Sequence, residues 1–159
     1  KKISLRSIDW FITNYSKKNN IYYLIYENKE GIRKFNENDN KLIKNINVFL
    51  SYKSQLKAYS KKKFDPFCRR ERINFYFKND KVIETTIGQL NFFRWAFENL
   101  VIDFISEHKK EIEDDMNLCL KEIKNTHKKT GERKKRQELS LSATRGLSRT
   151  NVSIKLNFD

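Results

Sequence analysis

The stretch Thr85 to Phe104, TTIGQLNFFRWAFENLVIDF, constrains the fold of this chain more than any other. Thr86 is followed three residues later by Gln89, a spacing typical of a capping box, in which both side chains satisfy backbone N–H groups at a helix start. Apolar residues then recur at three- and four-residue steps on one face and also occupy the opposite side. A helix that is apolar nearly all round belongs inside a domain, with other elements packed on more than one face. The first face carries Leu90, Phe93, Phe97, Leu100, Val101 and Phe104, and the opposite one carries Phe92, Trp95 and Ala96.

Three shorter helices are expected before this central helix. Residues 7–16 have apolar side chains on one face, and the first serine or Ser4 would cap the helix. Val48 to Tyr59 shows the same periodicity, with its lysines on the outer side. Asp65-Pro66 predicts the start of a one- or two-turn helix, because aspartate caps helix starts and proline is well tolerated at the first helical position.

Two β-hairpins are expected as well. β-branched and aromatic residues predict strands at residues 21–27 and 32–35, and a second pair at residues 73–77 and 82–86 that leads into the central helix. Residues 36–45 are polar and rich in asparagine, so we expect an exposed loop there. Together these elements predict one α+β domain over residues 1–124, in which a central buried helix packs with two β-hairpins and shorter amphipathic helices.

The apolar stripe narrows after Phe104, and the helix either continues or turns near Asn99 or His108. Residues 107–115 then hold five acids against two lysines, which favours a solvated helix face.

The charge of the chain is strongly positive. Lysine and arginine number 34 against 20 acids, a formal net charge of +14, and 13% of the residues are aromatic. The aromatic content favours a packed core over disorder. The charge favours a polyanionic partner, because each phosphate that a cation neutralises releases condensed counterions. Charge alone does not separate DNA, RNA, an anionic membrane and an acidic protein.

Two stretches hold nearly all of this excess charge, namely residues 53–72 with a net charge of +6 and residues 121–149 with +7. The first is expected to be folded and to bind phosphates beside a helix start. The alternatives there are a solvated helix end for the lysines and ion pairs with the acidic residues 107–115 for the arginines. The candidate nucleic-acid contacts in this stretch are Lys61, Lys62, Lys63, Arg69, Arg70 and Arg72.

Residues 125–150 are basic, rich in serine and threonine and nearly free of large apolar side chains, which predicts a basic arm. Such an arm tracks a phosphate backbone or is recognised as a nuclear-import signal. Residues 151–159 then alternate apolar and polar side chains, a pattern typical of a strand that joins a sheet of its own domain or of a neighbour. The candidate contacts in the arm are Lys128, Lys129, Arg133, Lys134, Lys135, Arg136, Arg145 and Arg149, and the partner-strand residues are Val152, Ile154, Leu156 and Phe158.

The sequence lacks the motifs of the common enzyme classes. It has no glycine-rich phosphate loop, and its two histidines form no recognisable pairing with a serine or cysteine nucleophile. Cys68 and Cys119 show no zinc-site spacing and are expected to be free thiols in a reducing compartment. The acids at residues 111–115 lie in one run and do not all converge on a metal ion. No apolar run approaches the ~18 residues of a membrane span, so we expect no enzyme activity, cofactor, metal or membrane span.

Three stretches of this chain resemble a family of small basic proteins of nucleocytoplasmic large DNA (giant) viruses. They are SYKSQLKAYSKKKFDPFCRRERI, TTIGQLNFFRWAFENLVIDFI and GERKKRQELSLSATRGLSRTNVSIKLNFD, and the likeness covers about two thirds of the chain, from Val48 onward. This family has no assigned activity. The resemblance therefore implies a viral origin and a place in the particle or the viral factory, without functional residues to carry over.

The hypothesis that follows is a non-enzymatic protein that binds nucleic acid, DNA rather than RNA, through phosphates with little base readout. It would act in the viral factory or the host nucleus and also be present in the virion. The main alternative is a structural or assembly protein of the virion, such as a minor capsid or scaffold component, whose basic arm and C-terminal strand dock on other virion proteins. A third alternative is an enzyme subunit that acts on nucleic acid.

Overall fold

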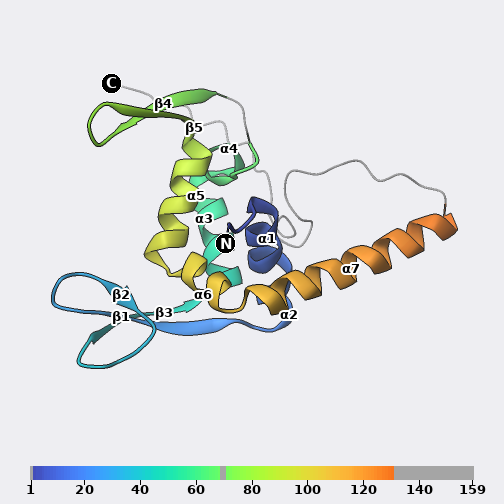
Figure 1. Cartoon of the computed structure of the whole chain (residues 1–159), viewed down its shortest axis with the longest axis horizontal. Coiled ribbons are helices and arrows are strands. Elements are labelled where there is room, and N and C mark those ends of the chain that lie inside the picture. Colours follow the sequence, from blue (N-terminus) through green and yellow to red (C-terminus); the bar gives the residue numbers. More distant parts are fainter. Residues whose placement is uncertain (1, 69–70, 131–159) are drawn as a thin grey trace, which may run out of the picture.

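The structure, a computed structural model, describes residues 2–68 and 71–130, with side chains to residue 126. Its mixture of helices and strands confirms the expected α+β class. Helices α3 (Val48–Tyr59) and α5 (Ile87–Glu98) lie side by side at the centre, where Trp95 Nε1 donates to Ser51 Oγ over 3.0 Å. The hairpin of β4 (Arg72–Phe77) and β5 (Lys81–Thr86) lies at one end and a three-stranded sheet at the other, while α7 (Lys109–Thr130) extends to the side (Figure 1).

The N-terminal helix begins with the expected serine cap and then changes type. Helix α1 (Leu5–Trp10) starts after Ser4, whose Oγ accepts a hydrogen bond from Ser7 N over 3.0 Å. A π-helical turn, η1 (Phe11–Tyr15), follows, in which the Ser16 N–H donates to the carbonyl five residues earlier, and α2 (Ser16–Lys18) completes the segment. The π turn brings the three consecutive side chains of residues 11–13 into the core, each fully buried.

The three-stranded antiparallel sheet has the order β2-β1-β3, built from β1 (Tyr22–Glu27), β2 (Arg33–Lys34) and β3 (Lys41–Asn47). It confirms the first expected hairpin. The prediction of a loop over residues 36–45 is wrong for residues 41–45, which form most of β3. Their side chains are all exposed, and burial begins only at Ile46. A strand without a buried face has no apolar alternation, so the sequence pattern did not reveal it.

The central helix is shorter than expected and splits in two. Thr86 Oγ1 accepts from Gln89 N over 3.1 Å, which confirms the helix start, although the Gln89 side chain bonds elsewhere. Leu100 adopts the left-handed conformation with φ 53°, and α6 (Val101–Glu107) follows it. A further break at His108 leads into α7. Both of the alternative turning points are therefore used, and Phe97, expected on a buried face, is 60% exposed.

Asn99 explains the first break. Its side-chain Nδ2 donates to Trp95 O over 2.7 Å and so ends α5. Its backbone oxygen accepts from the Tyr23 hydroxyl of β1 over 2.6 Å, and its Oδ1 accepts from Lys44 Nζ of β3 over 2.7 Å. The buried asparagine thus ties the end of α5 to the three-stranded sheet.

The prediction of a helix that starts at Asp65-Pro66 is wrong, because the helical turn comes before these residues. Helix α4 (Lys61–Phe64) ends at Asp65, whose Oδ1 accepts from Phe67 N over 2.9 Å and whose backbone oxygen accepts from Cys68 N over 3.2 Å. The aspartate therefore closes a turn instead of capping a helix. The second predicted hairpin and the predicted helix over residues 48–59 are confirmed.

Aromatic side chains form the centre of the core. Tyr52, Phe64, Phe92 and Trp95 pack together with ring centroids 5.6–6.0 Å apart. Phe104 of α6 stacks on Phe11 at 5.4 Å and on Tyr23 of β1 at 5.2 Å, so the sheet and the helices share one core.

Candidate nucleic-acid interface

The three lysines of α4 are presented to solvent by a buried anchor at the end of the same helix. Ser60, in a left-handed conformation with φ 66°, separates α3 from α4. Phe64 is fully buried, stacks on Tyr59 with centroids 5.8 Å apart, and packs between Tyr52 and Trp95. The lysines at positions 61–63 precede this anchor and are all exposed.

Side chains of α5 also hold the α4 segment in place, by hydrogen bonds to backbone oxygens of that segment. Asn91 Nδ2 donates to Lys63 O over 2.8 Å, and Gln89 Nε2 donates to Pro66 O over 3.2 Å. Gly88 allows the two segments to approach closely, since a Cβ at this position would lie 2.6 Å from Asp65 O. These contacts fix the position of the backbone that carries the lysines. Sequence reasoning missed these contacts, although a glycine inside an apolar helix pattern is a known signal of close packing.

Two lysines of this turn have no nearby acid among the described residues. Within the part of the chain that the structure describes, neither Lys62 nor Lys63 has a carboxylate in salt-bridge range, and Lys57 on the last turn of α3 is exposed beside them. Ammonium groups held in this way bind phosphate oxygens as point charges. We name Lys57, Lys61, Lys62 and Lys63 the α4 platform.

Arg72 lies in β4 and not on a helix with the lysines. Its Nη1 pairs with Glu84 Oε1 across the hairpin at 3.2 Å, and both side chains are more than half exposed. The alternative pairing of Arg72 with residues 107–115 is therefore wrong. An exposed ion pair contributes only about 0–1 kcal/mol, so a phosphate can compete for this guanidinium. Arg69 and Arg70 lie outside the described residues.

A pair of carboxyl groups lies next to the platform. Burial, together with the smaller effect of the nearby Asp65 carboxylate, raises the pKa of Asp9 in α1 to about 7. Asp65, which ends α4, is fully buried. Sequence reasoning missed this pair, because the two acids are far apart along the chain.

The acidic stretch at residues 107–115 is only partly the solvated face that we expected. Asp115 accepts a hydrogen bond from Trp10 Nε1 over 2.9 Å and pairs with Lys18 Nζ at 3.0 Å. Glu111 accepts from the Tyr15 hydroxyl over 3.4 Å. These acids hold α7 against the N-terminal helices, and the described residues contain no group of three histidines, cysteines or acids that could bind a metal ion.

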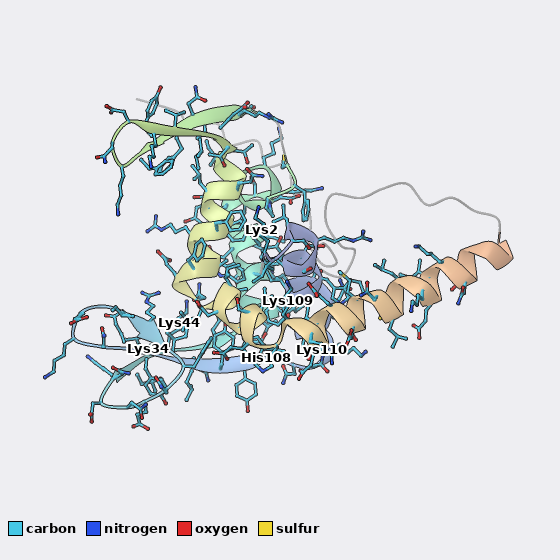
Figure 2. All side chains as sticks on the ribbon, viewed as in Figure 1. Lys2, Lys34, Lys44, His108, Lys109 and Lys110 are labelled. Carbon is cyan, nitrogen blue, oxygen red and sulfur yellow. The ribbon has the colours of Figure 1, made fainter. Side chains whose placement is uncertain are left out.

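Other basic residues gather near the start of α7 (Figure 2), where Lys109 and Lys110 lie beside His108. Lys109 donates to Lys2 O over 2.9 Å and lies 3.6 Å from Glu113, while Lys44 is bound to Asn99. Because several of these cations already have partners and acids surround them, they do not form a second platform.

Most of the predicted arm and all of the predicted C-terminal strand lie outside the described residues. Helix α7 continues to Thr130, so the first six residues of the expected arm are helical. The described ranges exclude the side chains of Lys128 and Lys129 and all of residues 131–159. The predicted contact residues within 131–159 are Arg133, Lys134, Lys135, Arg136, Arg145, Arg149, Val152, Ile154, Leu156 and Phe158.

Two further findings concern the remaining expectations. Cys68 and Cys119 are free cysteines. No helix among residues 2–68 and 71–130 combines the length and apolar content that crossing a bilayer requires.

Comparison with known proteins identifies the family. A family model described as "Family of unknown function (DUF7197)" matches residues 1–130. The chain belongs to this family. A curated relative, "Uncharacterized protein L507" of Acanthamoeba polyphaga mimivirus, is 42% identical over 145 residues, which cover 88% of this chain and 50% of the relative. The chain thus spans about half the length of that relative. The mimivirus match supports the giant-virus origin that the sequence resemblance implied, and no solved structure matches the chain.

Proposed function

We propose that this DUF7197 protein binds nucleic acid through its phosphates, with the α4 platform as the folded contact. The observation that carries the proposal is the exposed set of lysines on a turn whose position Phe64, Asn91 and Gln89 fix. The basic stretch from Lys128 to Arg149 would extend the contact along the backbone. Because point charges on lysines carry no base readout, we expect little sequence preference.

The test is fluorescence-anisotropy binding to a duplex DNA and to an unrelated RNA, over a salt series from about 50 to 200 mM. The variant carries Lys61→Gln, Lys62→Gln and Lys63→Gln together. We expect weaker binding and a log–log salt slope that is shallower by up to about 2.7, since each lost DNA phosphate contact removes about 0.9.

A matched control removes the same charge elsewhere. Lys34 and Lys41 on the three-stranded sheet and Lys29 in its β1–β2 turn are exposed, at the opposite end of the molecule from α4 (Figure 1). Their substitution by glutamine should leave the salt slope nearly unchanged. Equal losses in the two triple variants would show that only net charge matters and would contradict a specific platform.

A role in virion structure or assembly is the second candidate, and the alternating residues 152–158 beyond the basic stretch favour it, because an extended segment of this kind can add to a sheet of another protein. Under this proposal the chain is a minor capsid or scaffold component that docks on other virion proteins. Truncation after Thr130 separates the two candidates. Loss of nucleic-acid binding supports the first, and loss of incorporation into particles with nucleic-acid binding retained supports the second.

Each proposal implies a place in the infected cell where the protein acts. Binding of viral DNA would occur in the viral factory or the host nucleus, and an assembly role would carry the protein into the virion.

A further inference from the structure

The β4–β5 hairpin has an apolar face that the rest of the described chain leaves largely uncovered. Phe75 pairs with Ile83 across the hairpin, and directly paired residues lie on the same face. Because side chains alternate along a strand, Ile73 and Phe77 share that face. Phe75 is 42%, Phe77 41% and Ile83 46% exposed.

Both outer edges of this hairpin are also open. Among the described residues, β4 and β5 pair only with each other. Each strand therefore presents along its outer side a row of backbone N–H and C=O groups that no other strand of residues 2–68 and 71–130 pairs with. A two-stranded sheet of this kind is only marginally stable in water by itself. Figure 1 shows the hairpin at the end of α5, away from the three-stranded sheet.

The sequence contains one segment that matches this surface. Residues 152–158, VSIKLNF, alternate apolar and polar side chains, so an extended conformation places four apolar groups on one face. Their length is close to that of the six-residue strands β4 and β5. Lys155 would then lie on the opposite face, where the hairpin carries Arg72 and Glu84.

We propose that residues 152–158 of the same chain add to the β4–β5 hairpin as a third strand, with their apolar side chains on the face of Phe75 and Ile83. Strand addition satisfies one open edge by main-chain hydrogen bonds, while the alternating side chains give specificity. The polar side of the new sheet would keep Lys155, Ser153 and Asn157 in solvent.

The segment that connects α7 with residues 152–158 is long compared with α7 itself. Helix α7 has 22 residues and therefore spans about 33 Å. Residues 131–151 span up to about 70 Å when extended, which is about twice that length. A segment tethered to the same chain also has a raised effective concentration near its own hairpin, which favours it over the segment of a second copy.

This arrangement would close the basic stretch into a loop. The cations from Lys128 to Arg149 would be held between α7 and the hairpin. The hairpin itself leads into α5, which fastens the α4 platform. The inference does not depend on the proposed function, because the contact is apolar and involves no phosphate.

Hydrogen–deuterium exchange of the full chain tests the proposal. One variant carries Ile154→Asp and Leu156→Asp, and the matched control carries Ser153→Asp and Asn157→Asp, with the same added charge on the other face. We expect the first variant to accelerate exchange of amides in residues 71–86 at least about tenfold, because the edge and face become open. Amides of α3 should not change, and the control should resemble the wild type.

Two results would overturn the proposal. Equal exchange of residues 71–86 in the wild type and in both variants would show that the segment does not cover the hairpin. Protection that appears only at concentrations where light scattering gives the mass of a dimer would assign the strand to a second copy instead. Concentration-independent protection in a monomer supports the contact within one chain.

Discussion

Asn99 joins three elements through one buried side chain and its backbone, and its replacement should be costly. Asn99→Ala removes the bond that ends α5 and leaves Lys44 without its amide partner. We expect the free energy of unfolding to fall by about 2–3 kcal/mol, because a hydrogen bond to a charged group and a buried cap are lost together. Urea denaturation measures this change. Asn117→Ala, an exposed site on α7, is the control and should have little effect.

Asp9 should make stability depend on pH. Burial raises its pKa from the ordinary 3.8 to about 7, so the folded state keeps a proton that the unfolded chain releases. The stability present below pH about 4 is therefore lost as the pH rises to about 7. Asp9→Asn should raise the free energy of unfolding at pH 8 by up to about 4 kcal/mol relative to wild type, and by less at pH 5.

Chemical denaturation at pH 5 and pH 8 measures this difference. Asp114→Asn, at an exposed position of α7, removes a carboxylate without this burial and serves as the control. An Asp9→Asn effect of the same size at both pH values would contradict the linkage.

At the scale of elements, the contact between α4 and α5 depends on the absence of a side chain at position 88. Gly88→Ala gains up to about 1 kcal/mol of helix propensity. However, its Cβ would lie 2.6 Å from Asp65 O, a backbone atom that cannot turn away. Overpacking of this kind costs about 1–3 kcal/mol, so we expect a net loss of stability, measured by urea denaturation.

The same variant should weaken nucleic-acid binding if the platform is the contact, because the α4 backbone must shift. Ser54→Ala, at an exposed site of α3, is the control for both measurements. Unchanged stability in Gly88→Ala would show that the two segments separate without cost.

Elements with strong local signals could be predicted, and elements decided by tertiary contacts could not. Helix α3 and the β4–β5 hairpin have clear periodicity and were predicted with nearly correct bounds. The break at Leu100 depends on Tyr23 and Lys44, which bind Asn99 from a distant sheet. The α4 turn forms because Phe64 fits the aromatic core, a fact that no local pattern contains.

The candidate site shows the same division. The basic character of Lys61–Lys63 could be found by counting charges. The fixed position of these lysines could not be predicted, because Gly88 and Asn91 contact backbone atoms of the α4 segment, which lies elsewhere in the sequence. The position of Arg72 on the hairpin was missed, since the helix expected at Asp65 did not form.

At the scale of the whole molecule, Phe104 joins parts that the sequence separates widely. Its ring stacks on Tyr23 of the sheet, on Phe11 of the N-terminal turn, and on His108 at 4.2 Å. The sheet, the N-terminal helices and the central helices therefore share packing and should unfold together. The β4–β5 hairpin contributes no residue to either buried apolar cluster of the described chain.

The π-helical turn at Phe11–Tyr15 changes which way the end of the N-terminal helix faces. Its geometry is equivalent to one residue inserted into an α-helix, because its hydrogen bond reaches five residues along the chain in place of four. A relative that lacks one residue in this segment would have a continuous helix here and would turn Lys17 and Lys18 by about 100° relative to the core. A single-residue gap opposite this segment in an aligned relative would therefore indicate a straight helix and a different direction for these two lysines.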